Sequence, residues 1–298
     1  MWRHRADGDL ARDVPRTRRV MPYLMRGRNE AAVYAEHDVS LRKADAFIRE
    51  WNQANPGLRI DVFHLATWAL RQTLDRYPKM GDFVAGGRLY RRHGTWFSYA
   101  IKSKLEPDAP LLVVKRRFDL DESFAAMVEG MRDTEHAYRS GESARVDREL
   151  GLLLAFPGFI RRILMRGVNV ADRLGMLPKS FIENDPMYAT AFFANMASLG
   201  MPAVYHHLYE YGTCGVFSSL GRPTTEPGSP TSGPDRRRTM NVRWTYDERV
   251  EDGLMAWLAI RRFAQVMEDP AATALTVETV APVAGRAVGE TLDDAARS

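Results

Sequence analysis

The sequence contains a single cysteine, Cys214, among its 298 residues. Because one thiol cannot form an internal disulfide, a disulfide-stapled secreted scaffold and a thiolate metal cluster are both excluded. The chain has no apolar run near the roughly 20 residues that a membrane-spanning helix needs. Its basic N-terminus is not followed by the apolar core of a secretory signal. These features predict a cytoplasmic protein.

A strong excess of either charge is missing as well. The 42 Lys and Arg residues are nearly balanced by 38 Asp and Glu residues, which leaves a formal net charge of +4. This surplus is too small to predict nucleic acid as a partner. The sequence has no glycine-rich phosphate loop and no His, Cys and Asp spacing typical of a metal site. We therefore expect no bound metal and no resident cofactor.

What is present is an ordinary globular composition, with 45% hydrophobic and 27% charged residues. The clearest strand is 239–246, where apolar residues at even positions alternate with polar residues at odd positions. Asp61 precedes a helix that is apolar nearly all round and is expected to be central, and Asp121 is expected to cap a later helix. The order of elements predicts a mixed α/β domain without regular βαβ alternation. Further strands are predicted at 32–37, 87–92, 94–103, 110–118, 190–197 and 214–220.

The chain divides into three parts by composition. Residues 1–17 are expected to form a solvated basic arm, 18–270 a single domain, and 271–298 a poorly ordered tail. Within the domain, 150–178 is an unusual insertion that is both apolar and basic. One interpretation is a helical insertion that packs on the core or on a neighbouring subunit. The other is a membrane-surface helix, or a lid over an apolar substrate.

A charged turn connects the clearest strand to the last apolar helix. Its sequence is D-E-R-V-E-D-G from Asp247 to Gly253, and the following helix stops at E-D-P, residues 268–270. The turn is therefore the first place to look for chemistry. Shorter segments precede it along the chain: R-R at 18–19, L-M at 24–25, Y-P at 77–78 and S-L-G-M at 198–201.

With these segments the chain resembles the catalytic domain of the 2-oxo acid dehydrogenase acyltransferases, the dihydrolipoamide acyltransferase family related to chloramphenicol acetyltransferase. That family ends its domain with a strand, a D-H-R-x-x-D/N-G turn, a helix and an E-D-P stop. The resemblance covers about residues 18–270. It implies an α/β (α+β) fold of the chloramphenicol acetyltransferase-like CoA-dependent type, a mixed sheet with packed helices. It also implies a homotrimer with active sites between subunits.

The resemblance further implies catalytic roles, and here the sequence departs from the family. The family's turn His takes the proton from a thiol, and a Ser of the S-N-L-G strand donates to the oxyanion. In this chain Glu248 stands at the His position, and Ala197 or, in a shifted alignment, Ala194 stands at the Ser position. A carboxylate with an ordinary pKa is a poor base for a thiol unless burial raises that pKa.

The remaining residues of the turn follow the family pattern. Asp252 is retained, with Arg18 or Arg19 as its expected partner, while Arg249 and Gly253 keep the shape of the turn. The catalytic candidates are therefore Glu248 and Asp252.

Three further residues are substrate-binding candidates. Ser198 lies in the S-L-G-M segment, and His206 and His207 echo an H-H-x-x-x-D-G motif of a related superfamily. Tyr211 stands where that motif requires Asp, and the motif belongs at a strand-to-helix turn. The alternative is that both His are polar residues of an aromatic-rich connection.

Two functions from different classes remain open. The first is an acyltransferase-like enzyme that uses an acyl thioester, either acyl-CoA or an acyl carrier protein, with Glu248 as general base. The second is a catalytically inactive homotrimer that acts as a binding or scaffold protein. A peripheral membrane contact through 150–178 is a third hypothesis, carried by apolar residues beside Arg161, Arg162 and Arg166.

Overall fold

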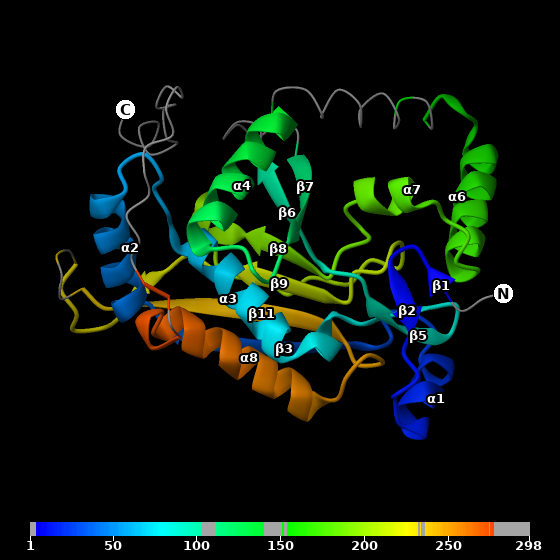
Figure 1. The fold of residues 1–298 in the computed structure, drawn as a ribbon, viewed down its shortest axis with the longest axis horizontal. Helices are drawn as coiled ribbons and strands as arrows, with labels where there is room; N and C mark the ends of the chain where they lie inside the picture. The colour runs from blue at the N-terminus through cyan, green and yellow to red at the C-terminus, as the bar shows by residue number, and fades with distance from the viewer. Residues whose placement is uncertain are drawn as a thin grey trace.

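The computed structural model describes residues 4–102, 111–139, 151, 154–231, 233, 236–273 and 275–276. Its centre is a seven-stranded mixed sheet in which β10, β11, β9, β8, β6 and β7 lie in that order and β3 pairs with β11. The predicted α/β class with a mixed sheet is confirmed (Figure 1). The strands are β3 (Ala32–Ser40), β6 (Thr95–Lys102), β7 (Leu111–Phe118), β8 (Ala191–Asn195), β9 (Val216–Leu220), β10 (Thr224–Thr225) and β11 (Arg238–Asp247).

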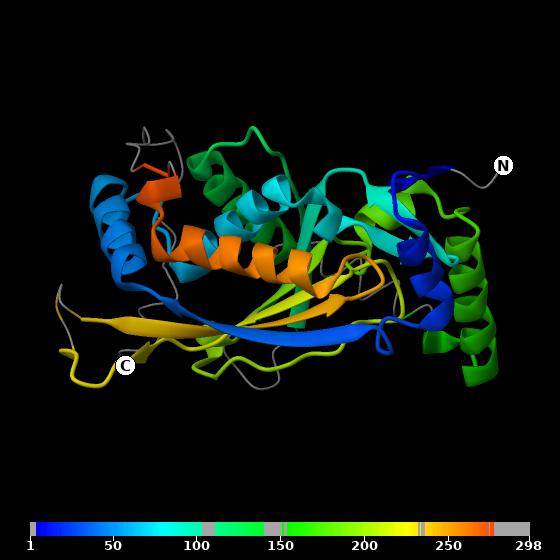
Figure 2. The same cartoon turned by 90° about the horizontal axis from the view of Figure 1, so that it is seen from below.

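Helices cover one face of this sheet, as the view from below shows (Figure 2). The prediction for Asp61 is confirmed: its carboxylate accepts hydrogen bonds from the backbone of Phe63 and His64 and so caps the first turn of a largely buried helix. Ser123 rather than Asp121 caps the helix that follows β7, because the Ser123 hydroxyl accepts from the Ala126 N–H. The helices of this layer are α2 (Arg42–Ala54), α3 (Val62–Arg76), α4 (Phe124–Ala137) and α8 (Gly253–Glu268).

The alternation predicted along β11 places its even-numbered residues on the helix side. Val242, Trp244 and Tyr246 belong to the main core and are at most 6% exposed. The opposite face is crossed by residues 201–215, whose Leu208 packs with Phe217 in a second, smaller cluster. The sheet is therefore covered by helices on one face and partly covered by an irregular segment on the other, where Tyr34, Glu36 and Asp38 of β3 stay exposed.

The N-terminal segment differs from the expected solvated arm. Residues 4–10 form two strands of a second, four-stranded antiparallel sheet in the order β1, β2, β5, β4. Arg5 is buried, and its guanidinium pairs with Asp7 at 2.8 Å and with Asp172 at 2.6 Å. Composition did not reveal this because a buried arginine needs partners that are remote in sequence. The elements here are β1 (His4–Arg5), β2 (Gly8–Leu10), α1 (Arg16–Leu24), a 3₁₀ turn η1 (Pro78–Gly81), β4 (Phe83–Ala85) and β5 (Arg88–Arg92).

The insertion expected at 150–178 is largely helical where the structure describes it. Helix α6 (Gly158–Arg173) stands at the edge of the molecule, and the short α7 (Lys179–Asn184) leads back to β8 (Figure 1). Most of the expected tail, 277–298, lies outside the described residues. No described helix combines the length and the hydropathy of a membrane span. Two further 3₁₀ turns are η3 (Met196–Leu199) and η4 (Ala271–Thr273).

Candidate functional site

The charged turn is built around a buried ion pair between its first and third residues. Asp247 ends β11, and its two carboxylate oxygens accept from Nε and Nη2 of Arg249 at 2.8 and 2.7 Å. Both side chains are at most 5% exposed. Bidentate geometry of this kind adds directional constraint to charge attraction. The pair therefore fixes the backbone on both sides of Glu248.

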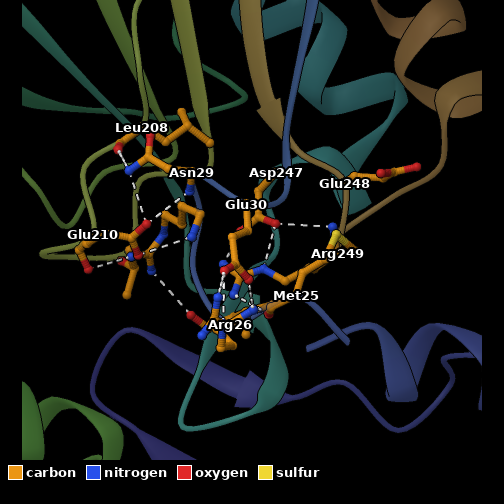
Figure 3. A network of polar contacts seen from close by, with 12 residues as sticks. Met25, Arg26, Asn29, Glu30, Leu208, Glu210, Asp247, Glu248 and Arg249 are labelled. Carbon is orange, nitrogen blue, oxygen red and sulfur yellow. Dashed lines mark hydrogen bonds and ion pairs between the residues drawn. The ribbon is translucent and has the colours of Figure 1, made fainter. Parts of the chain in front are cut away.

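Glu248 is held by its backbone while its side chain is left clear. Its N–H donates to the carbonyl oxygen of Ala31 at 2.9 Å, and its own carbonyl oxygen accepts from Nη1 of Arg18 at 2.6 Å. The residue is half-buried. Figure 3 shows its carboxylate directed away from the Asp247–Arg249 pair. The turn thus fixes the backbone of Glu248 and leaves its carboxylate outside the buried ion pair.

Asp252 closes the turn and opens the last helix. Its carboxylate accepts from the Met255 N–H at 3.0 Å, which caps α8, and lies 3.7 Å from Nη2 of Arg18. The expected pairing of Asp252 with Arg18 is therefore present. Arg19 instead donates to the carbonyl oxygens of Val14 and Arg12. Arg18 joins both ends of the turn to α1.

Tyr246 lies directly beneath the turn. Burial, together with the nearby Glu248 and Asp252 carboxylates, raises the pKa of its phenol above the ordinary value. The ring also lines an apolar cavity of about 30 Å³ between α3, α8 and the sheet, which includes Val216 and Trp244. This space is close to one water in size and does not accommodate an acyl chain. Tyr246 was not among the sequence-based candidates, because in the sequence it is one more apolar residue on the inward face of a strand.

A second polar network, also absent from the sequence-based candidates, ties the 201–215 segment to the chain before β3. The Glu210 carboxylate accepts from the backbone N–H groups of Arg28 and Asn29 at 3.1 and 2.9 Å (Figure 3). Although burial opposes its ionisation, these hydrogen bonds hold the pKa of Glu210 below its usual range. Arg28 is buried and donates to the carbonyl oxygens of Glu210 and Val84. Both Glu210 oxygens and both Nη atoms of Arg28 have hydrogen-bond partners, whereas the buried Nε of Arg28 has none among the described residues.

His206 and His207 lie on the outer face of the sheet, away from α8. The His206 ring stacks on Phe217 with centroids 4.0 Å apart, and its Nδ1 is 2.7 Å from the His207 carbonyl oxygen. Burial lowers the pKa of His206, and the adjacent His207 acts in the same direction. The Thr245 hydroxyl donates to the His206 carbonyl oxygen at 2.6 Å. Within one chain, therefore, neither His joins Glu248.

Ser198 lies at the other end of the sheet from Glu248. Register places Asn195 beside Leu220 and Leu220 beside Val242, so the end of β8 is level with the middle of β11, five residues before Asp247. Ser198 follows β8, whereas Glu248 follows the far end of β11, and at about 3.4 Å per residue this separates them by roughly 17 Å or more. The Ser198 hydroxyl donates to the Asn195 carbonyl oxygen at 2.7 Å. One chain does not bring the two residues together.

A larger and more polar cavity of about 170 Å³ lies between the small sheet, β6, β7 and α7. Its Arg92 and Lys115 donate to carbonyl oxygens, Arg92 to Thr213 at 2.8 Å and Lys115 to Ile182 at 2.6 Å. Burial lowers the pKa of Lys115 to about 8, and the Arg92 charge adds to this. Arg92 and Lys115 thus each form a hydrogen bond to the backbone of a segment that packs beside them. Among the described residues, no three His, Cys, Asp or Glu side chains converge as metal ligands would.

Comparisons with known proteins give a fold and no family. No protein-family model and no curated protein matches the sequence. Among solved structures, a probable dihydrolipoamide acetyltransferase from Listeria monocytogenes is similar over 92% of this chain and 98% of its own, with 13% identity and a TM-score of 0.54. The cubic core of a pyruvate dehydrogenase complex is similar over 87% of this chain and 88% of its own, with 17% identity and a TM-score of 0.55.

Chloramphenicol acetyltransferase is similar over 87% of this chain and 99% of its own, with 12% identity and a TM-score of 0.50. Identities this low carry the fold alone. The chain therefore has the chloramphenicol acetyltransferase-like fold of these acyltransferases, with a strand, charged turn and helix that hold Glu248.

Proposed function

We propose that this protein transfers an acyl group from a thioester, with Glu248 as the general base. The observation that carries the proposal is the turn itself: a carboxylate directed away from a bidentate ion pair, with both of its backbone groups hydrogen-bonded. Its occurrence on a fold shared with solved acyltransferases supports acyl transfer as the reaction class.

Fixing a catalytic group before the substrate arrives is a large part of catalysis, because ordering it during the reaction costs entropy. In this chain Arg18 and the Asp247–Arg249 pair hold the backbone of Glu248 in place. Asp252 acts as a positioning residue, since it caps α8 and contacts Arg18. Glu248 would accept the proton of the attacking hydroxyl or thiol and return it to the departing thiolate.

A single chain leaves the site incomplete, which supports a homotrimer. The Ser198 end of the sheet and the Glu248 end are far apart in one subunit, so closed threefold symmetry can bring Ser198 of one subunit to Glu248 of the next. The cubic core among the similar structures is itself a symmetric assembly. Contact with a second subunit would also desolvate Glu248, and desolvation makes a carboxylate a stronger base.

The substrate is proposed to be acyl-CoA or an acyl carrier protein. Ser198, on its exposed turn, and the exposed His207 with its neighbour His206 are the polar groups available to bind it at a subunit contact. For Ser198 to serve, its hydroxyl must turn from the Asn195 carbonyl oxygen toward the substrate.

The alternative is a trimeric binding or scaffold protein without catalysis. It is favoured by one observation: the Ser198 hydroxyl is satisfied locally, and Ala194 and Ala197 nearby have no hydroxyl to donate. Loss of an oxyanion donor typically lowers kcat by about 10²–10³-fold.

Thiol release from a panel of acyl-CoA donors, short to long, separates the two functions. Wild type is compared with Glu248→Gln, which keeps the shape and removes the base, and with Glu251→Gln, the same change three residues further along the turn. We expect Glu248→Gln to lose about 10²–10⁴-fold in rate while the control stays near wild type. No release by wild type, in a sample that is folded by circular dichroism and trimeric by light scattering, would overturn the catalytic proposal and favour the scaffold.

A further inference from the structure

Helix α6 is packed on the protein in an unusual orientation. None of its 16 residues is buried. Its partly buried positions include Arg161, Met165, Val168 and Asp172, which follow helical spacing and form a stripe on one side. Asp172 on this side pairs with the buried Arg5 at 2.6 Å. The helix therefore docks on the body through a mixed, partly charged face.

Its most apolar face points the other way. Phe159, Ile163 and Val170 lie on one side of the helix, and 63%, 61% and 53% of their surfaces are exposed. Both views place α6 at the outer edge of the molecule (Figures 1 and 2). Amphipathic helices of soluble domains normally turn such a stripe toward the core. Among the described residues nothing covers this one.

Cationic side chains border the apolar stripe. Arg162, Arg166 and Arg173 share one side of α6, adjacent to Phe159, and all three are exposed. The single acidic residue of the helix, Asp172, is committed to Arg5. An apolar stripe beside a row of guanidinium groups is the pattern of helices that lie in the plane of a membrane interface.

We propose that α6 docks this protein on an anionic lipid surface. The apolar stripe enters the boundary between headgroups and acyl chains, and the arginines contact lipid phosphate and carboxylate groups. Further apolar side chains are exposed in the chain just before and just after the helix: Leu154 and Phe156 before it, and Leu174 and Met176 after it.

Charge favours lipid over a second copy of α6 as the occupant. In a pair of such helices packed stripe to stripe, the arginines would border the contact without an acidic partner, because Asp172, the one acidic residue of α6, pairs with Arg5. A bilayer rich in anionic lipid offers the complementary charge. The α1 helix lies at the same end of the molecule in both views and exposes Tyr23 and Leu24. The proposal does not depend on catalysis by Glu248.

Vesicle flotation tests this, with phosphatidylcholine vesicles compared with vesicles that also contain phosphatidylserine. Wild type is expected to float with the anionic vesicles and less with the neutral ones. Phe159→Ser and Ile163→Ser should each weaken binding about tenfold, and Arg162→Gln and Arg166→Gln about fivefold each. Leu120→Ser, at a position 56% exposed in the β7–α4 connection, is the matched control and should bind like wild type.

Several results would overturn the proposal. These are absence of flotation with anionic vesicles, or binding that Phe159→Ser and Ile163→Ser leave unchanged. A change in oligomeric state in Ile163→Ser, seen by light scattering without any lipid binding, would instead assign the stripe to a contact between subunits. Circular dichroism of each variant confirms that loss of binding is not loss of fold.

Discussion

Two regions of this molecule, the β11–turn–α8 unit and helix α6, differ in how much of their surface is buried. In the first, Asp247, Arg249 and most of the inward side of α8 are buried, and the backbone of Glu248 is hydrogen-bonded on both sides. In the second, a helix of the same length has no buried residue and exposes its apolar stripe. Apolar residues at helical spacing thus pack into the core in α8, whereas in α6 they remain exposed on the surface.

The difference shows which substitutions report on folding and which report on binding. A residue whose contacts are already made inside the chain loses them when it is truncated. A residue whose contacts lie outside the chain can be truncated with little effect on the free energy of unfolding. Four substitution experiments sharpen this contrast, from the largest expected effect to the smallest.

The same substitution should have very different costs on the two helices. Phe263 of α8 is 1% exposed, and Phe263→Ala is expected to lower the free energy of unfolding by about 3–5 kcal/mol. Phe159→Ala on α6 should stay within about 0.5 kcal/mol of wild type. Urea denaturation measures both. Similar costs for the two variants would show that α6 is packed more tightly than its exposure indicates.

Breaking the buried pair of the turn should be nearly as damaging. Asp247→Ala leaves the Arg249 guanidinium buried without a countercharge, and we expect a loss of about 3–5 kcal/mol in thermal or urea unfolding. The double variant Asp247→Ala/Arg249→Ala should cost less than the sum of its two single variants, because neither member of the pair is then left without its partner. Additive costs would mean that the two residues do not act as a pair.

Asp82 provides a pH-dependent test near the same turn, because its backbone lies close to Gly215, which bonds Asp247. Burial raises its pKa to about 6, and Arg91, with Nε 3.6 Å from the carboxylate, offsets only part of this. The folded state therefore holds the proton more tightly than the unfolded state.

As pH rises from about 4 to 6, this group should lower the free energy of unfolding by about 2–3 kcal/mol. Asp82→Asn removes that contribution, so the difference between variant and wild type should grow in favour of the variant across this range. A difference that is constant with pH would contradict the raised pKa.

The smallest effect is expected at the cap of α8. Asp252→Ala removes the acceptor for the Met255 N–H and the contact with Arg18, and should cost about 1 kcal/mol. Glu251→Ala in the same turn serves as the control and should be nearly neutral. A loss in Asp252→Ala several times larger would show that the contact between Arg18 and the exposed Asp252 carboxylate contributes more to stability than surface pairs usually do.

Local patterns in the sequence predicted much of the framework. The alternation along β11, the cap at Asp61 and the pairing of Asp252 with Arg18 are all present, the last of them implied by the resemblance. Ser123 instead of Asp121 at the start of α4 was missed because both are good capping residues and only the backbone path decides between them. The Arg28–Glu210 network and the buried Arg5 escaped prediction because their partners are distant in the chain.

The sequence by itself determined the fold class, the charged turn and the amphipathic character of α6, because these follow from residue type and spacing over a few turns of chain. Only the tertiary structure decided which way the α6 stripe points, that residues 4–10 join a sheet, and that Ser198 and Glu248 lie at opposite ends of one subunit. These outcomes depend on how segments that are distant in the sequence pack together. The free energy that favours one packing is a sum over many long-range contacts, and a local sequence pattern does not contain them.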